Sequence, residues 1–174
     1  TVQTIALLLH RAHLGPALVV CPTSVEGNWR DELARFAPSL AVHAYRERRS
    51  LDGLGPGDVL LASYGLVLRQ AADFAGLAVA TLVADEAQQV KNADAKRTRA
   101  LAGVQAQMRV ALTGTPVENR LDELWSILSL AVPGLLGSRE RFASSFAAPI
   151  EAGGAAAATV REALRRRIAP FVLR

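Results

Sequence analysis

The stretch Leu82-Val83-Ala84-Asp85-Glu86-Ala87-Gln88 is the most informative part of the chain for its fold class. Its apolar residues are typical of a buried strand, and two adjacent carboxylates follow them directly. Ligands of parallel α/β sheets bind beyond the carboxyl ends of the strands. There one carboxylate can hold the water shell of magnesium while its neighbour orients the water that attacks a γ-phosphate. The same pattern also occurs where a strand simply ends in acidic turn residues.

Apolar runs on either side of this stretch alternate with helical patterns along the chain. Several of these runs are apolar on both faces, which is typical of a parallel sheet that helices cover on both sides. We predict strands over residues 17–21, 41–45, 58–64, 80–85 and 109–113, and helices over 2–14, 24–36, 93–104, 121–132, 138–147 and 156–168. Alternating elements of this kind predict an α/β domain with a mainly parallel sheet.

Turn and capping residues complete this prediction. Ser24 and Asn92 are expected N-caps of two of the helices. Residues 46–58 are rich in Arg, Gly and Pro and are expected to form a surface loop, and residues 152–159 a flexible connection or frayed helix start. Because only helical patterns follow residue 132, we predict a lobe over residues 1–132 and a helical C-terminal extension over 133–174.

Three other predicted strands also end in polar residues, which are Thr113-Gly114-Thr115, Pro22-Thr23-Ser24 and Ser63-Tyr64. Gly114 permits a backbone bend that other residues resist, and the flanking hydroxyls can bridge to a neighbouring element. Thr23 and Ser24 precede a predicted helix, where backbone N–H groups can bind a phosphate of ATP or of nucleic acid. Taken alone, each pattern is more often an ordinary turn or helix N-cap.

Composition places the chain among ordinary globular proteins. It has 174 residues, of which 51% are hydrophobic and 21% charged. Its apolar runs of about 5–7 residues are too short for a membrane span, which needs roughly 20. The single cysteine, Cys21, excludes an internal disulfide and fits a reducing compartment. The three histidines have no metal-ligand spacing with Cys21.

The net charge of +4 resides at the C-terminal end, because residues 161–174 contain five Arg and one Glu. A nucleic-acid partner therefore does not follow from charge alone. The chain begins at Thr1, has its only Met at position 108 and shows no signal-peptide pattern. We expect it to be part of a longer protein.

Taken in order, the motifs closely resemble the first motor lobe of Swi/Snf-type ATPases, the DNA translocases of helicase superfamily two. Thr1 matches the end of that family's phosphate loop. The similar segments are Pro22-Thr23-Ser24 with Asn28-Trp29 (motif Ia), Ser63-Tyr64 (motif Ib), Asp85-Glu86-Ala87-Gln88 (motif II), and Leu112-Thr113-Gly114-Thr115-Pro116 with Glu123-Leu124-Trp125 (motif III and its extension). The Gln-type motif II and residues 133–150 are more similar to bacterial or archaeal members.

The resemblance implies a RecA-like P-loop NTPase lobe that binds ATP and magnesium. Thr1 and Asp85 would hold the metal, Glu86 would orient the attacking water, and Gln88 would contact the γ-phosphate or the second lobe. It further implies that Thr113, Gly114 and Thr115 couple the ATP state to the grip on DNA, and that Thr23, Ser24, Ser63 and Tyr64 lie near DNA phosphates.

The resemblance also implies partners and a location. We expect double-stranded DNA and a second RecA-like lobe as partners, no membrane, and a cytoplasmic, nucleoid-associated bacterial or archaeal protein. The isolated chain is expected to lack useful ATPase activity, since the phosphate-loop Lys and the arginine fingers of the second lobe lie outside it. Strand 109–113 would then have an open edge, which a neighbouring molecule, a local segment or self-association could cover.

Two alternatives to an ATP-driven translocase remain at this point. One is a non-catalytic nucleic-acid or protein-binding module on a degenerate motor fold, although such a module has no need of both Asp85 and Glu86. The other is a strand-separating helicase or a restriction-enzyme motor subunit, which shares motifs I to III. The Asn28-Trp29 and Glu123-Leu124-Trp125 segments favour the Swi/Snf branch.

Overall fold

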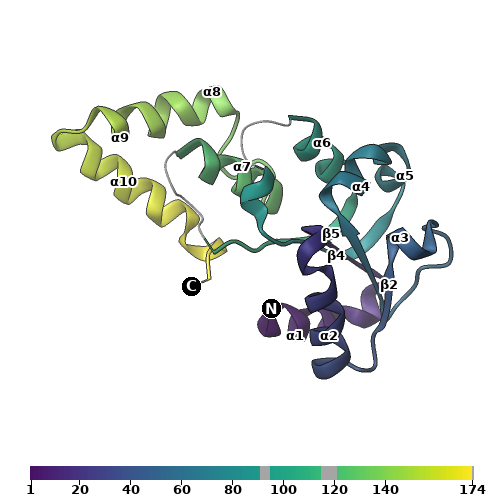
Figure 1. Ribbon diagram of the computed structural model, residues 1–174. Coiled ribbons are helices and arrows are strands. Elements are labelled where there is room, and N and C mark those ends of the chain that lie inside the picture. The colour runs from purple at the N-terminus through teal and green to yellow at the C-terminus, as the bar shows by residue number, and fades with distance from the viewer. Residues whose placement is uncertain (91–94, 115–120, 174) are drawn as a thin grey trace. The chain divides into compact units, whose positions relative to one another are not determined.

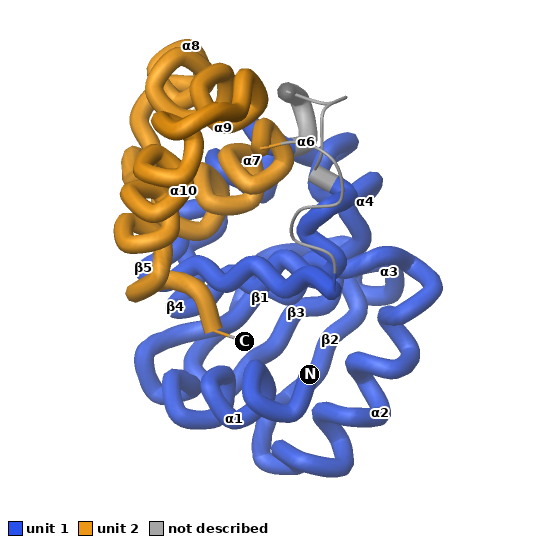
Figure 2. The backbone as a smooth tube through the Cα atoms, turned by 90° about the vertical axis from the view of Figure 1, so that its left-hand side faces the viewer, with its two compact units in different colours: residues 1–114 blue, residues 115–174 orange. Residues whose placement is uncertain are grey.

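The computed structural model describes residues 1–90, 95–114 and 121–173 (Figure 1). They group into two compact units, residues 1–114 and 115–174 (Figure 2). Helix α7 (Leu121–Ala131) belongs to the second unit, whereas sequence analysis assigned those residues to the first lobe. A functional division after residue 132 stays a prediction.

Unit 1 contains a five-stranded sheet in which every neighbouring pair of strands is parallel. The strand order is β2-β3-β1-β4-β5. The strands are β1 (Ala17–Cys21), β2 (Ala41–Ala44), β3 (Asp58–Ser63), β4 (Ala78–Ala84) and β5 (Gln105–Ala111). The predicted α/β fold with a parallel sheet is confirmed. The main error in the strands is at β5, which begins four residues before the predicted start at 109.

Helices cover both faces of this sheet. Helix α1 (Val2–Arg11) and helix α2 (Glu26–Phe36) lie on one side, and helices α4 (Tyr64–Arg69), α5 (Ala71–Ala75) and α6 (Ala95–Gly103) lie on the other (Figure 1). Trp29 and Leu33 are one helical turn apart on α2 and pack in one cluster with Val19 and Val83 of the sheet. Residues 18, 20, 60 and 82 alternate to the other face of their strands, and α4 contacts β1 and β3.

Several short elements in unit 1 were not predicted. Helix α3 (Tyr45–Arg48) begins at the last residue of a predicted strand and continues into the expected surface loop. Helices α4 and α5 lie where no helix was predicted, whereas α6 agrees with the helix predicted over 93–104. The prediction that Ser24 caps α2 is wrong. Residues Thr23–Val25 form a 3-10 turn, and Val25 occupies the N-cap without a side-chain hydrogen bond. Asn92 lies outside the described residues.

Unit 2 is helical, as predicted. Its elements after α7 are α8 (Arg139–Phe142), the π-helical η4 (Ala143–Ala147), α9 (Ala148–Ala152), α10 (Ala155–Ile168) and η5 (Ala169–Phe171). The hydroxyl of Ser138 accepts a hydrogen bond from the Arg141 N–H and so caps α8. Leu124, Phe142 and Leu164 are buried together in its core.

Strand β5 forms one edge of the described sheet, because it pairs with β4 alone among the described strands. The expected open edge and the self-association of the isolated chain both stay predictions. None of the helices in the described ranges is long and apolar enough to cross a membrane.

Candidate functional site

The polar segments after β3, β1, β4 and β5 meet at one edge of the sheet. Cys21 is in register with Ser63, and Val20 with Ala84, so parallel β3, β1 and β4 end side by side. Backbone hydrogen bonds continue beyond the strands. The Asp85 N–H donates to the Val20 carbonyl, and the Ala87 N–H donates to the Leu112 carbonyl, each at 2.8 Å. The sheet therefore brings the segments carrying Ser63-Tyr64, Asp85-Glu86 and Thr113 to its carboxyl edge.

From the described residues Asp85 accepts three hydrogen bonds, two of which come from side chains of other elements. The indole N–H of Trp29 on α2 donates to Asp85 Oδ2 at 2.7 Å, and the Glu86 N–H donates to Oδ1 at 2.9 Å. The Tyr64 hydroxyl donates to the Asp85 backbone carbonyl at 2.7 Å. Burial raises the pKa of Tyr64, and the nearby Asp85 charge raises it further. The phenol consequently stays protonated and available as a donor.

Glu86 occupies a left-handed backbone conformation with φ of 50°. Such a conformation costs of order 1–3 kcal/mol for a residue with a side chain, and it is maintained only where neighbours impose it. The Gln88 amide donates to the Glu86 carboxylate, and the Thr113 hydroxyl donates to Gln88 Oε1 at 2.6 Å. Gln88 thus connects the acidic pair to the segment after β5.

The remaining predicted site residues are placed differently. Thr23 and Ser24 are exposed at the start of the α2 segment, and Gly114 is exposed after β5. Ser63 caps α4, its hydroxyl accepting from the Leu66 N–H at 3.3 Å. Thr1 is exposed ahead of α1. Thr115 lies outside the described residues.

The donor set around Asp85 is compatible with magnesium. Mg²⁺ takes hard oxygen ligands, keeps several waters and usually needs only one or two carboxylates together with substrate phosphates. Asp85 and Glu86 are both partly exposed, and each Asp85 carboxylate oxygen accepts one hydrogen bond from the described residues, which leaves it further lone pairs. Within the described ranges, no group of three His, Cys, Asp or Glu side chains could enclose a metal ion.

Cys21 lies beneath this edge and is fully buried. Burial, together with the charges of Glu26 and Asp85, raises its pKa to about 12. The thiol is therefore neutral near pH 7 and is a core side chain rather than a nucleophile.

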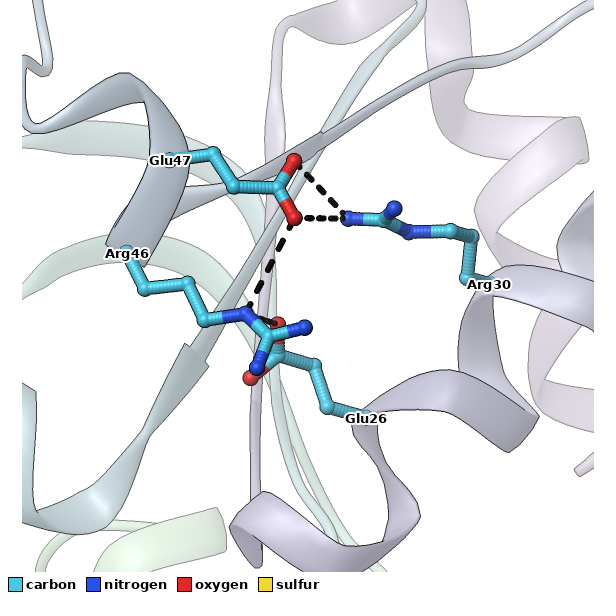
Figure 3. A network of polar contacts seen from close by, with 4 residues as sticks. All are labelled: Glu26, Arg30, Arg46 and Glu47. Carbon is cyan, nitrogen blue, oxygen red and sulfur yellow. Dashed lines mark hydrogen bonds and ion pairs between the residues drawn. The ribbon is translucent and has the colours of Figure 1, made fainter.

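A second polar network joins α2 to α3 at the surface (Figure 3). Arg30 Nη2 lies 3.0 and 3.1 Å from the two Glu47 carboxylate oxygens. Arg46 Nε lies 3.1 Å from Glu26 Oε1 and 3.8 Å from Glu47 Oε1. Glu26 is buried, and its Oε1 accepts no well-aligned hydrogen bond, so its contact with Arg46 is an ion pair.

The family model of the SNF2-related domain matches residues 1–174, the whole chain. The chain belongs to this family. It is 41% identical over 161 residues to the putative ATP-dependent helicase/translocase YwqA of Bacillus subtilis, covering 87% of this chain and 18% of that protein. It is 33% identical over 177 residues to the TATA-binding protein-associated factor mot1 of Schizosaccharomyces pombe, covering 94% of this chain and 9% of that protein.

A solved structure gives the same assignment. The SWI2/SNF2 ATPase core of Sulfolobus solfataricus in complex with dsDNA matches with a TM-score of 0.85 and 40% identity, over 98% of this chain and 36% of that one. The SNF2-related domain described here therefore spans only a small part of its curated relatives and about a third of this solved core.

Sequence analysis assigned no individual role to Trp29, which the structure places against Asp85. Trp29 was noted only as part of a motif, although its helical spacing with Leu33 indicates a buried face, and a buried indole N–H usually finds a partner. Tyr64 was predicted to lie near DNA, but its side chain is 4% exposed and its hydroxyl is bound to Asp85.

Proposed function

We propose that this chain is part of the ATP-binding motor lobe of an ATP-dependent double-stranded-DNA translocase. The observation that carries the proposal is the connection of Asp85 and Glu86, through Gln88, to Thr113 at the carboxyl edge of a parallel sheet. Membership of the SNF2-related family supports it. The printed names of the relatives, a putative helicase/translocase and a SWI2/SNF2 core with dsDNA, support it as well.

In this proposal the acidic pair divides the work of ATP hydrolysis. Asp85, with the Thr1 hydroxyl, would hold Mg²⁺, which when bound neutralises charge on the β- and γ-phosphates. The Glu86 carboxylate would orient the attacking water and accept its proton. Gln88 would sense the γ-phosphate or the second lobe, because its amide already lies against Glu86.

Coupling to DNA would use the other segments at the same edge. Thr23 and Ser24 are exposed and can donate to a DNA phosphate, whereas Ser63 and Tyr64 would contribute by shaping the adjacent turn. Thr113, with Gly114 and Thr115, would transmit the ATP state, since Thr113 binds Gln88 directly. We place the protein at the bacterial or archaeal nucleoid, with a second RecA-like lobe completing the ATP site.

The proposal is tested on the full-length protein by ATP turnover with and without double-stranded DNA. Glu86→Gln should keep ATP binding and lower turnover by about 10²–10⁴-fold, the usual contribution of a general base. Glu151→Gln, the same exchange at an exposed position in α9, should leave turnover unchanged. Unchanged turnover in Glu86→Gln would remove the base role from Glu86.

Two further measurements separate the alternatives. DNA binding without any ATP hydrolysis by the wild-type protein would favour a non-catalytic module. Displacement of a third strand from a DNA triplex, with the underlying duplex left intact, would favour a translocase. Release of single strands from the duplex would favour a strand-separating helicase.

A further inference from the structure

We propose that Trp29 and Tyr64 are positioning residues for the acidic pair, holding Asp85 and the Glu86 turn in the orientation that receives magnesium and nucleotide. The inference rests on the proposed function of Asp85 and Glu86, and it assigns a task to two side chains that lie behind them.

Asp85 accepts hydrogen bonds from two buried side chains that reach it from different elements. The Trp29 indole reaches its carboxylate from α2, and the Tyr64 hydroxyl reaches its backbone carbonyl from the start of α4, each at 2.7 Å. Trp29 is 2% exposed and Tyr64 4% exposed, so neither ring can follow a displaced Asp85 without disturbing the core. Side chains locked by packing hold a site more accurately than flexible surface donors.

The bond from Tyr64 also acts on Glu86. A hydrogen bond to the Asp85 carbonyl orients the peptide plane that joins Asp85 to Glu86, and Glu86 then adopts a φ of 50°. This left-handed conformation is unfavourable for glutamate and persists only where the surroundings impose it. Tyr64, across β1 from Asp85, is one of the groups that impose it.

The bond from Trp29 acts on the carboxylate. It occupies one lone pair of Oδ2, and the Glu86 N–H occupies one of Oδ1, so the remaining lone pairs have a defined direction. The Trp125 indole, by comparison, donates at 3.2 Å to a neutral acceptor, the backbone carbonyl of Gly137. A bond from indole to carboxylate is charge-assisted and correspondingly stronger.

The first test measures magnesium-dependent nucleotide binding to the full-length protein, with a fluorescent ATP analogue and without turnover. Tyr64→Phe removes the hydroxyl donor and keeps the ring, and Trp29→Phe removes the indole N–H donor and keeps a smaller aromatic ring. We expect each to raise the Mg²⁺ concentration for half-maximal binding by about 10-fold, the lower end of the effect of removing a partner behind a metal ligand. Trp125→Phe and Tyr45→Phe make the same exchanges at the other Trp and Tyr of the chain and should cause no shift.

The second test needs neither metal nor nucleotide. With ¹⁵N-labelled tryptophan in the full-length protein, the Trp29 indole resonance is identified by its loss in Trp29→Phe. Asp85→Asn, in which a neutral amide replaces the carboxylate, should shift this resonance and leave that of Trp125 in place. If Trp29→Phe does not fold, the Tyr64→Phe titration still decides the matter.

The failures of the two proposals are distinguishable. A Trp29 resonance that ignores Asp85→Asn, or magnesium dependence unchanged in Tyr64→Phe while Asp85→Asn abolishes it, would overturn the positioning role and leave the ATPase proposal standing. Unchanged turnover in Glu86→Gln, together with a Trp29 resonance that does respond to Asp85→Asn, would overturn the assigned hydrolytic mechanism and leave the contact in place.

Discussion

Helix α2 takes part in two polar networks of opposite character. On its buried face, Trp29 donates from the core to the Asp85 carboxylate, and no cation of the described residues takes part. At its surface, Glu26 and Arg30 form ion pairs with Arg46 and Glu47 of α3, and three of these four side chains are about half exposed (Figure 3). The buried contact depends on packing, whereas the surface contacts depend on charge. Salt screens the ion pairs between the exposed side chains, whereas the Trp29 indole carries no net charge to be screened.

We expect the largest loss of stability from truncating Trp29, the buried residue of this comparison. Trp29→Ala removes a fully packed indole from the core cluster with Val19 and Leu33, and such truncations cost about 3–5 kcal/mol. Hydrogen exchange of the β1 amides in the full-length protein would measure the lost free energy of opening. Leu173→Ala, an exposed apolar truncation, is the control and should change protection little. A loss below about 1 kcal/mol for Trp29→Ala would show that the indole is not a structural anchor.

Arg46→Met probes the point where the surface network reaches the interior. The Glu26 side chain is 4% exposed, and Arg46 is 54% exposed, so removing Arg46 leaves a buried carboxylate without its cation. Loss of one partner of a fully buried pair costs about 3–5 kcal/mol. Because Arg46 is half exposed and water can enter, we expect a smaller loss of about 1–2 kcal/mol. The same exchange measurement applies, and Glu26→Gln combined with Arg46→Met should recover much of the loss. No recovery would show that Arg46 acts by packing.

Sequence reasoning located the features that depend on local patterns and missed those that depend on the tertiary fold. Strand ends were predictable, because β1, β3 and β4 are largely apolar and polar residues stand at or directly after their ends. The contact between Tyr64 and Asp85 was not, since it requires the order β3-β1-β4, which strand patterns do not specify. Helix α3 was missed because four residues with three charges have no apolar stripe, and its ion pairs with α2 depend on the tertiary fold.

The charges of one residue from each network, Glu26 and Asp85, act on the Cys21 thiol. We therefore expect the protein to lose stability at alkaline pH. Burial, Glu26 and Asp85 raise the pKa of Cys21 from 9.0 to about 12. Between these values the folded protein keeps a proton that the unfolded chain has lost, so stability falls as pH rises from about 9 to about 12. The slope from this group is at most about 1.4 kcal/mol per pH unit. Cys21→Ala should lessen the fall in Tm above pH 9. Parallel Tm curves for the two proteins would show that the thiol does not contribute.

The smallest effect is expected for the outermost pair, Arg30 and Glu47. Their side chains are 44% and 57% exposed, so water screens the attraction and most of the pair's energy is lost to solvation and side-chain entropy. A double-mutant cycle with Arg30→Met and Glu47→Gln should give a coupling energy of about 0.2–1 kcal/mol, measured by exchange protection in α2. At 1 M salt the Debye length falls to about 3 Å, and the coupling should vanish. The bond between Trp29 and Asp85 should persist in the same buffer, as its indole resonance would show. A salt-resistant coupling between Arg30 and Glu47 would mean that the surface network is as rigid as the buried one, and the contrast between the two sides of α2 would fail.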